Sequence, residues 1–308
     1  MSPFKNLDCY RNLPSPLVVT FSGGRSSGYQ LAHILEANSG LPDGAVVLFE
    51  NTGFELPATY QFIDDFSRAF NVAITWLQWD IGEPTKVRVV NHDSASRDGA
   101  PLLDLFSTPL LRVDKSVGLR PLPNPVQRTC SANLKTKTAH RYARQHLGWP
   151  NRYWAALGYR ADEDGRVKRR LKQEERYVNG CPEGGWGAFP MHRAGVTSED
   201  VLAFWDAMPF DLGIESWEGN CDFCFMKSEW KLKDMMARYP GRLQPWLDLE
   251  AAPRDRSNRF RKDRRPLSEL WADVQRGDMS ATAQDPAIEC SSCTGDFIAP
   301  EDMDLEAA

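Results

Sequence analysis

Hydrophobic residues in the first half of the chain form short continuous runs, and segments with helical spacing separate them. The runs at 17–21 (LVVTF), 45–49 (AVVLF), 72–79 and 153–157 (YWAAL) are typical of buried parallel strands. Residues 26–37, and a segment that begins at Pro57, repeat apolar side chains at the spacing of an amphipathic helix. Alternating strands and helices predict an α/β fold, with a parallel sheet covered by helices on both faces.

The pattern changes in the second half of the chain. Residues 83–127 contain several prolines and predict a long excursion with one short helix at about 102–111. The polar, glycine-rich residues 161–187 predict a mobile loop. A capping box at Thr197–Asp200 begins a helix, and further helices are expected at 227–238 and 267–276. We therefore expect an α/β core at residues 1–160 and a smaller, mainly helical part at 161–308.

Charge and cysteine content narrow the classes of function. The net charge of -5 does not attract nucleic acid to the surface as a whole. No apolar run approaches 18 residues and no secretory signal is visible, so we expect a cytoplasmic protein that does not contact a membrane. Seven cysteines, with two C-x-x-C pairs, favour metal or redox chemistry over a disulfide framework in such a chain.

A glycine-serine loop follows the first predicted strand and precedes a helix. Its sequence, SGGRSSG at 22–28, is typical of a phosphate cradle. Glycines let backbone N–H groups approach an anion, and a helix N-terminus adds free donors and a positive end. The loop lacks the lysine of a GxxxxGK[ST] P-loop. We predict phosphate binding by Ser22, Gly23, Gly24, Arg25, Ser26 and Ser27.

The loop resembles the SGGxxS loop of the PP-loop, or N-type, ATP pyrophosphatases. Within that superfamily, five segments in order resemble the phosphoadenosine-phosphosulfate reductase-like family, including phage and bacterial members with a GNCxxCF-x-K stretch. They are 21–28, FENTG at 49–53, RTC at 128–130 with LK at 134–135, LGYR at 157–160, and GNCDFCFMK at 219–227. The resemblance implies an adenine-nucleotide α-hydrolase-like sheet, which binds ATP or an adenylyl sulfate. It also implies nucleotide contacts from Asn51, Thr52, Gly53, Gly158 and Arg160.

Several of the cysteines are candidate metal ligands or sulfur carriers. A C-x-x-C turn lets two thiolates converge on one ion, which favours Cys221 and Cys224 as metal ligands. Related sulfur-transferring enzymes bind a [4Fe-4S] cluster through a cysteine at the position of Cys130 and a later C-x-x-C. Cys290 is expected as the fourth ligand and Cys293 as a catalytic sulfur carrier, although Cys181 remains open as the fourth ligand. Spacing alone does not distinguish zinc from iron–sulfur.

Charged residues supply the remaining predictions. Arg25, Lys135 and Arg160 are expected to neutralise phosphate charge together with Mg²⁺. The run at 254–265 can track a nucleic-acid backbone, with Phe260 stacking on a base. A solvated linker is the alternative. The basic residues of the run are Arg254, Arg256, Arg259, Arg261, Lys262, Arg264 and Arg265.

Three functions fit these features. The first is an adenylating, pyrophosphate-releasing sulfurtransferase that acts on a nucleic-acid acceptor and takes sulfur from a donor protein. The second is a sulfonucleotide reductase that uses a thioredoxin-like partner. The ECSSC segment at 289–293 keeps the Glu-Cys of that class but lacks its Gly and His. The third is a nucleotide-responsive nucleic-acid-binding module with structural zinc. The oligomeric state cannot be derived from the sequence.

Overall fold

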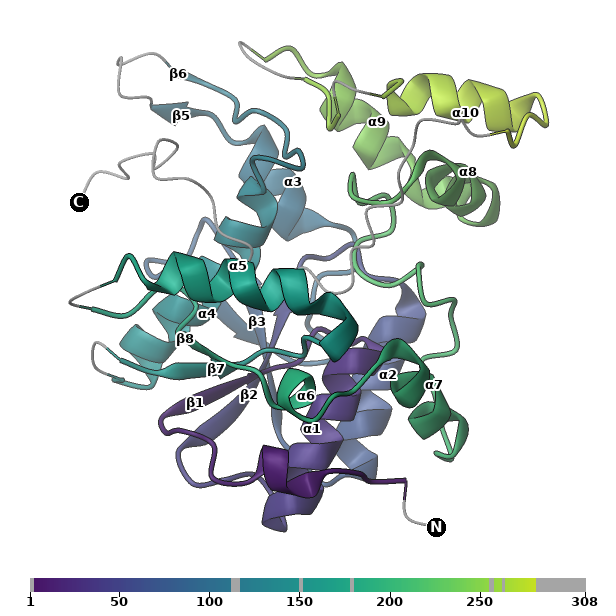
Figure 1. Ribbon diagram of the computed structural model, residues 1–308. Coiled ribbons are helices and arrows are strands. Elements are labelled where there is room, and N and C mark those ends of the chain that lie inside the picture. Colours follow the sequence, from purple (N-terminus) through teal and green to yellow (C-terminus); the bar gives the residue numbers. More distant parts are fainter. Residues whose placement is uncertain are drawn as a thin grey trace.

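A six-stranded, mostly parallel sheet forms the centre of the molecule (Figure 1). The computed structural model describes residues 3–111, 117–149, 152–177, 180–254, 258–261 and 264–280. The strand order is β4-β3-β2-β1-β7-β8. β1 pairs in parallel with β2 and β7, whereas β4 is an antiparallel edge strand. The strands are β1 (Leu17–Thr20), β2 (Ala45–Asn51), β3 (Ile74–Trp79), β4 (Val87–Val90), β7 (Trp154–Ala156) and β8 (Trp186–Ala188).

Helices cover both faces of this sheet. Successive residues of a strand point to opposite faces, so one strand contributes side chains to two hydrophobic clusters. Leu17 and Val19 pack into one hydrophobic cluster with side chains of α1, α2 and α7. Val18 lies between them in sequence and joins a second cluster with Ala139 and Ala143. The helices are α1 (Arg25–Asn38), α2 (Pro57–Ala69), α4 (Lys137–Arg141) and α7 (Ser198–Asp206). The predicted α/β fold with a parallel sheet between helices is confirmed.

The segment at 161–187 is folded, and the prediction of a mobile loop there is wrong. It contains α5 (Asp164–Glu174) and leads into β8, which extends the core sheet beyond residue 160. A buried ion pair explains the order. The Arg170 Nε lies 2.6 Å from Glu174 Oε1, and the same oxygen accepts a hydrogen bond from the backbone N–H of Gly187 in β8. The local polarity of the sequence therefore reflects a buried polar contact rather than a solvated loop.

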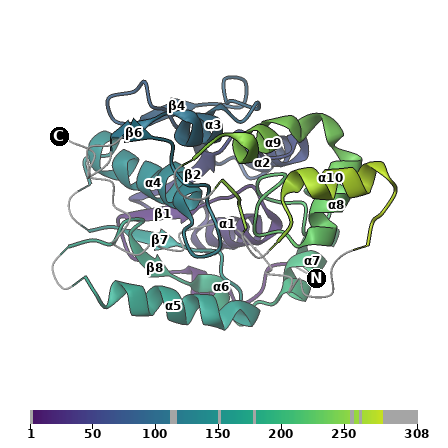
Figure 2. The ribbon, with the colours of Figure 1, turned by 90° about the horizontal axis from the view of Figure 1, so that it is seen from above.

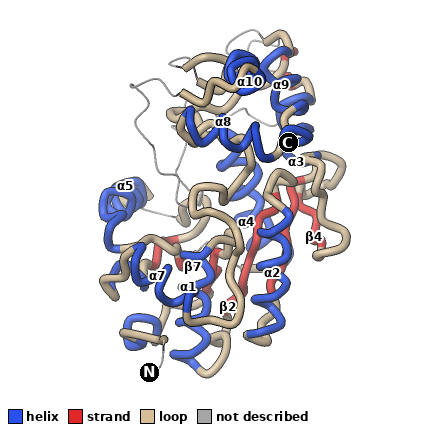
Figure 3. The backbone as a smooth tube through the Cα atoms, turned by 90° about the vertical axis from the view of Figure 1, so that its right-hand side faces the viewer, coloured by secondary structure: helices blue, strands red, loops and turns tan. Residues whose placement is uncertain are grey.

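Three helices near the C-terminal end of the described chain pack around another hydrophobic cluster, which they share with Phe54 of the β2–α2 loop and Trp79 of β3. They are α8 (Glu229–Arg238), α9 (Gln244–Ala251) and α10 (Leu267–Gln275). Their cluster includes Met235, Trp246 and Leu270, and it reaches α3 (Ala100–Ser107). In Figures 2 and 3 these three helices lie together, away from β7. This confirms the smaller, mainly helical C-terminal part. No described helix has both the length and the apolar character needed to cross a membrane.

Polar contacts join the helical part to the sheet through the β2–α2 loop. The backbone N–H of Asp222 donates to the carbonyl oxygen of Phe54 at 2.9 Å. Arg242 donates to the Asp222 carboxylate at 2.7 Å and to the carbonyl oxygen of Glu55 at 3.1 Å. Asp222 is fully buried, and burial raises its pKa to about 6 although Arg242 opposes the rise. The two parts therefore meet through a desolvated ion pair.

The remaining elements are short connections. α6 (Pro190–Arg193) links β8 to α7, and a two-stranded ribbon is formed by β5 (Leu110–Leu111) and β6 (Val117–Gly118). The capping box predicted at the start of α7 is present. The Thr197 hydroxyl accepts from the Asp200 N–H, and the Asp200 carboxylate accepts from the Thr197 N–H.

Candidate functional site

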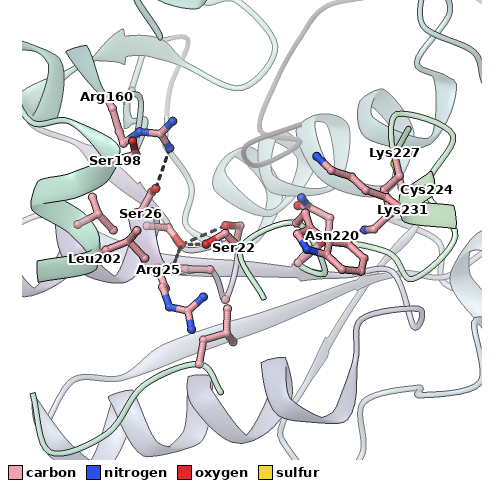
Figure 4. A pocket seen from close by; sticks show the side chains of 18 residues that line it. Ser22, Arg25, Ser26, Arg160, Ser198, Leu202, Asn220, Cys224, Lys227 and Lys231 are labelled. Atoms are coloured by element: carbon pink, nitrogen blue, oxygen red, sulfur yellow. Dashed lines mark hydrogen bonds between the residues drawn. The ribbon is translucent and has the colours of Figure 1, made fainter. Parts of the chain in front are cut away.

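A cavity of about 260 Å³ lies between the sheet and the segment that precedes α8. The loop at 22–27 forms one wall, with Arg160 beside it (Figure 4). Asn220, Cys224, Lys227 and Lys231 form the facing wall. Other lining residues are Ser198, Val201, Leu202, Leu212, Ser216, Trp217 and Gly219. Among the described residues that line it, there are two arginines and two lysines but no carboxylate. The cavity therefore favours an anion.

The loop at 22–27 forms a compact turn that ends at the N-terminus of α1. It connects the end of β1 to α1, which begins at Arg25 with Gly24 as its N-cap. The Ser27 hydroxyl donates to the Gly24 carbonyl at 2.9 Å and accepts from the Ser22 N–H at 3.2 Å. Gly23 has a φ of 73°, and an added Cβ would lie 2.6 Å from Thr59 Cγ2. The first N–H groups of α1 have no partner within the helix, so they can bind an anion.

Arg160 and Arg25 both line the cavity but are held differently. The Arg160 Nη1 donates to the Ser26 hydroxyl at 3.2 Å (Figure 4). Its Nε donates to the Asp162 carboxylate at 2.9 Å. The Arg25 Nε donates to the Asp211 carboxylate at 2.7 Å, and its Nη1 donates to the Ile214 carbonyl. Both arginines are therefore paired with carboxylates, Arg160 with Asp162 and Arg25 with Asp211, and only Arg160 also contacts the loop through the Ser26 hydroxyl.

Lys227 stabilises the turn that carries the Cys221–Cys224 pair. Its side chain is buried, and its Nζ donates to the carbonyl oxygens of Gly219 at 2.8 Å and Cys221 at 2.9 Å. A longer contact of 3.4 Å reaches the carbonyl oxygen of Glu218. One amine therefore gathers successive carbonyls of the turn and fixes how Cys224 faces the cavity. These hydrogen bonds give a structural explanation for the lysine in the GNCDFCFMK segment.

Asn51, Thr52 and Gly53 lie in a buried turn at the end of β2 and do not line the cavity. The Gly53 N–H donates to the Asn51 side chain at 3.1 Å, and the Thr52 hydroxyl donates to Glu55 at 2.8 Å. Gly158 follows β7, and an added Cβ there would lie 3.4 Å from the Ser27 Cα. Gly158 therefore allows β7 to approach the loop. The nucleotide contacts expected from these residues stay predictions.

Three of the described cysteines, Cys130, Cys221 and Cys224, belong to one hydrophobic cluster but have different surroundings. Cys224 is 7% exposed and lines the cavity. Cys221 faces inward, with its Sγ 3.2 Å from the Thr52 hydroxyl. Burial raises the pKa of the Cys221 thiol well above its ordinary value; the charge of Glu55 adds to the rise and Lys135 opposes it. Cys130 is near enough to Cys221 to raise that pKa further.

Lys135 is buried between Cys221 and a carboxyl group on β2 rather than at the cavity. Burial raises the pKa of Glu50 to about 7, and the charge of Lys135 opposes the rise. Lys135 is also 8% exposed and is absent from the lining of the cavity. The role assigned to Lys135 stays a prediction.

A metal centre does not assemble from the described residues alone. No group of three or more Cys, His, Asp or Glu side chains in that part of the chain could hold a metal ion. Cys290 and Cys293 lie outside the described residues. Cys181 packs against a different hydrophobic cluster from Cys130, Cys221 and Cys224, and its Sγ donates to the Tyr153 carbonyl at 3.7 Å. The described cysteines therefore do not by themselves fit a cluster.

The basic run at 254–265 is largely engaged within the protein. Arg254 donates to the carbonyl oxygens of Phe106 at 2.7 Å and Arg120 at 2.6 Å. Arg265 pairs with Asp273 at 2.7 Å. Phe260 is 3% exposed and contacts Trp246, so it is not available to stack on a base. Arg264 donates to the Lys227 carbonyl, and Arg261 is buried. Arg256 and Lys262 lie outside the described residues.

Sequence reasoning missed several residues that line the cavity. Asn220 and Lys227 belong to the GNCDFCFMK segment, and their position in that motif was an available signal. Trp217 and Lys231 flank the motif, and Leu202 lies on α7, far away in sequence. No spacing or composition singles out these three residues, because only the packing of α7 and α8 brings them to the cavity.

Comparison with known proteins places the chain in a family. No protein-family model matches it. The uncharacterized nin region protein ORF290 of Escherichia phage lambda is 32% identical over 220 residues, which cover 70% of this chain and 67% of that protein. The chain belongs to the ORF290 family. This match establishes common ancestry with the phage protein, and it assigns no reaction to the ORF290 family.

Two solved structures have low similarity to this ORF290-family protein. A phosphoadenylyl-sulfate reductase from Candida auris, in a phosphate complex, has a TM-score of 0.36 and 15% identity, covering 68% of this chain and 82% of that one. The U34-tRNA thiolase NcsA from Methanococcus maripaludis, with its [4Fe-4S] cluster, has a TM-score of 0.35 and 13% identity, covering 91% and 76%. At these TM-scores the likenesses assign no chemistry to the protein.

Proposed function

We propose that this protein is a PP-loop type enzyme that binds ATP and transfers its adenylyl group, with release of pyrophosphate, before sulfur is inserted into a nucleic-acid acceptor. One observation carries the proposal. A single cavity joins the serine-glycine loop at the N-terminus of α1, the guanidinium group of Arg160 and the thiol of Cys224. Its lining contains four basic residues and, among described residues, no acidic one, although Arg25 and Arg160 pair with carboxylates outside the lining. This excess of positive groups in the lining supports binding of a polyphosphate.

In this proposal the loop holds the phosphates and Arg160 stabilises the charge that develops on them. The N–H groups of residues 24–27 and the Ser22 and Ser26 hydroxyls donate to phosphate oxygens. Mg²⁺, when bound with the nucleotide, would neutralise part of the phosphate charge. An acceptor oxygen attacks the α-phosphate and pyrophosphate leaves. A sulfur nucleophile supplied by a donor protein then displaces AMP from the adenylated acceptor.

Cys224 also supports a second candidate, a sulfonucleotide reductase. A thiol in the wall of an anion-binding cavity can meet the sulfate group of an adenylyl sulfate as well as an adenylated base. That reaction would need a second thiol and a thioredoxin-like reductant. It would release no pyrophosphate from ATP. The substrate that turns over therefore distinguishes the two candidates.

A cysteine-ligated centre is a separate part of the proposal. Cys130, Cys221 and Cys224 would need Cys290 or Cys293 to complete four thiolate ligands. Metal and acid-labile sulfide analysis of anaerobically purified protein measures this directly. About four iron and four sulfide per chain support an iron–sulfur cluster, and about one zinc without sulfide supports a structural site.

Pyrophosphate and AMP release from ATP, measured with RNA or DNA acceptors and a sulfide source, tests the proposed function. We expect acceptor-dependent release of both products. Arg160→Gln should lower kcat by about 100-fold, because a charge that stabilises the transition state is lost. Arg11→Gln, which removes an exposed arginine paired with Asp8, is the matched control and should leave kcat unchanged.

Three results bear on the alternatives. Sulfite release from an adenylyl sulfate and thioredoxin, without pyrophosphate from ATP, would favour the reductase. ATP binding without turnover, in a zinc protein that binds nucleic acid, would favour the binding module. Absence of any binding of ATP or adenylyl sulfate would reject the assignment of the loop to phosphate.

A further inference from the structure

Two tryptophans form an aromatic step beside the cavity. The ring centroids of Trp217 and Trp230 lie 5.3 Å apart, with an interplanar angle of 62°. Trp217 lines the cavity, whereas Trp230 is 43% exposed and does not. None of the other exposed large hydrophobic side chains among the described residues is aromatic. The step therefore runs from the cavity wall to the surface and ends in an exposed indole.

The exposure of Trp230 is not explained by the packing of α8. The inner face of that helix places Leu232, Met235 and Met236 in the core of the helical part. Trp230 lies outside that face, in the first turn of the helix. Exposing a large indole costs free energy, since apolar surface is left in water. A ligand that covers the ring would recover part of that free energy.

A cation accompanies the exposed ring. The Lys231 Nζ lies 5.5 Å from the centroid of the Trp230 ring, and Lys231 also lines the cavity. Lys231 makes no ion pair with any described residue. The Arg238 guanidinium lies 5.5 Å from the Trp217 ring but pairs with Asp234 at 2.7 Å. Lys231 is therefore the cation of this step that can meet a phosphate.

We propose that Trp230 and Lys231 form a docking surface for an unpaired base of single-stranded nucleic acid, with the base stacked on the indole and its phosphate near Lys231. The inference rests on the proposed function, because it names where the acceptor docks. Stacking on aromatic side chains and contact with a nearby cation is how single strands bind proteins without sequence readout. The docked strand lies beside the cavity in which its neighbouring base would be adenylated.

Two features favour this occupant over others. A nucleotide held by the loop would place its own base against the lining of a cavity of about 260 Å³, which includes Trp217 but not Trp230. The ring of Trp230 is thus left for a second base. A protein partner would instead require a broad apolar patch around the indole, whereas the nearest exposed groups here include the cation of Lys231.

Fluorescence anisotropy with labelled 12-nucleotide single strands of RNA and of DNA tests the proposal, on the full chain at two salt concentrations. Trp230→Ala should weaken binding by on the order of tenfold or more, and Trp230→Phe should retain most of it. Lys231→Gln should weaken binding and reduce the salt dependence by about one phosphate contact. Leu171→Ala, at an aliphatic exposed position on α5, is the matched control and should bind as the wild type does.

Several outcomes would overturn the proposal. These are equal binding by the wild type and Trp230→Ala, equal affinity for a fully paired duplex, or no binding of any strand by the wild type. Loss of ATP binding in Trp230→Ala would instead assign the indole to the nucleotide. Loss of binding to a sulfur-donor protein with unchanged strand affinity would assign it to a protein contact. Strand binding through Trp230 without pyrophosphate release would support the docking surface and reject the proposed reaction.

Discussion

Of the two adjacent glycines of the loop, the structure requires glycine at only one position. Gly23 has a φ of 73°, and an added Cβ would lie 2.6 Å from Thr59 and 2.9 Å from Ile63. Gly24 has a φ of -106°, and the nearest atom to an added Cβ is the Ser22 Oγ at 3.6 Å. Any residue can adopt the backbone of Gly24, whereas Gly23 requires both the left-handed region and empty space.

Gly23→Ala should therefore distort the loop and Gly24→Ala should not. We expect Gly23→Ala to lower the free energy of unfolding by about 1–3 kcal/mol, since it combines backbone strain with a contact against α2. The same change should weaken ATP binding at least tenfold. Gly24→Ala is the control and should cost less than about 1 kcal/mol. Urea unfolding and titration calorimetry measure both; equal stability of the two variants would contradict the argument.

The sequence predicted the position of the loop, but it did not predict the tertiary contacts of the nearby side chains. The strand, the glycines and the start of α1 follow from local pattern, so Ser22–Ser27 was found directly. The neutralisation of Arg25 by Asp211 depends on a contact between residues 186 positions apart. The burial of Phe260 against Trp246 depends likewise on tertiary packing. Local sequence does not contain such information.

At the level of elements, the turn at 219–224 is organised by a single lysine. Lys227 is 5% exposed, and its amine is the donor to the carbonyl oxygens of Gly219 and Cys221. The turn has no regular secondary structure of its own. Its conformation, and with it the direction of Cys224, therefore depends on this side chain. Lys231, one helical turn further, lines the same cavity without such contacts.

Lys227→Met should loosen this turn while α8 stays folded. Each carbonyl that loses its buried donor costs about 1–3 kcal/mol. We expect faster amide hydrogen exchange in peptides that cover residues 216–226. Lys231→Met is the matched control and should leave exchange in those peptides unchanged. Unchanged exchange in Lys227→Met would show that the turn is held by other contacts.

The helices and strands themselves differed in how far their patterns revealed them. Apolar runs identified β1, β2, β3 and β7, and the capping box identified α7. α5 escaped because its sequence is polar, and its order depends on the buried pair of Arg170 and Glu174. The short edge strand β4 buries Val87 but leaves Val89 exposed, so its pattern is weak. Elements built on polar contacts or on a sheet edge lack the apolar run by which the others were predicted.

At the scale of the whole molecule, the helical part packs on the sheet through an apolar cluster that includes Phe54 and Trp246, and the buried pair of Asp222 and Arg242 lies beside this contact. Asp222 is fully buried, and its ionised form depends on the guanidinium group. Its pKa of about 6 in the folded protein lies above the ordinary 3.8. The folded state therefore binds the proton more tightly than the unfolded state, so stability falls as pH rises between about 4 and 6.

Arg242→Gln should extend this loss of stability to higher pH. Without the guanidinium, burial raises the pKa of Asp222 further, so the variant should be less destabilised at pH 5 than at pH 8. At pH 8 we expect a cost of about 3–5 kcal/mol, because a buried charge is left unpaired. Hydrogen exchange should increase in α8–α10 more than in β1–β3.

Arg68→Gln, which removes an exposed ion pair on α2, is the control for this measurement. It should change the free energy of unfolding by less than about 1 kcal/mol at either pH. A cost for Arg242→Gln that is equal at pH 5 and pH 8 would show that Asp222 does not titrate with the docking of the two parts.

One wall of the cavity belongs to the sheet and the facing wall to the segment that enters α8. A molecule that spans it touches both parts, so its affinity and the closeness of their docking are thermodynamically coupled, and the coupling is reciprocal. Ligand would raise the protection of α8–α10 although it touches few of their residues. A variant that weakens the docking of the two parts tenfold would lower the affinity for the ligand by up to the same factor, although it changes no group that contacts the ligand.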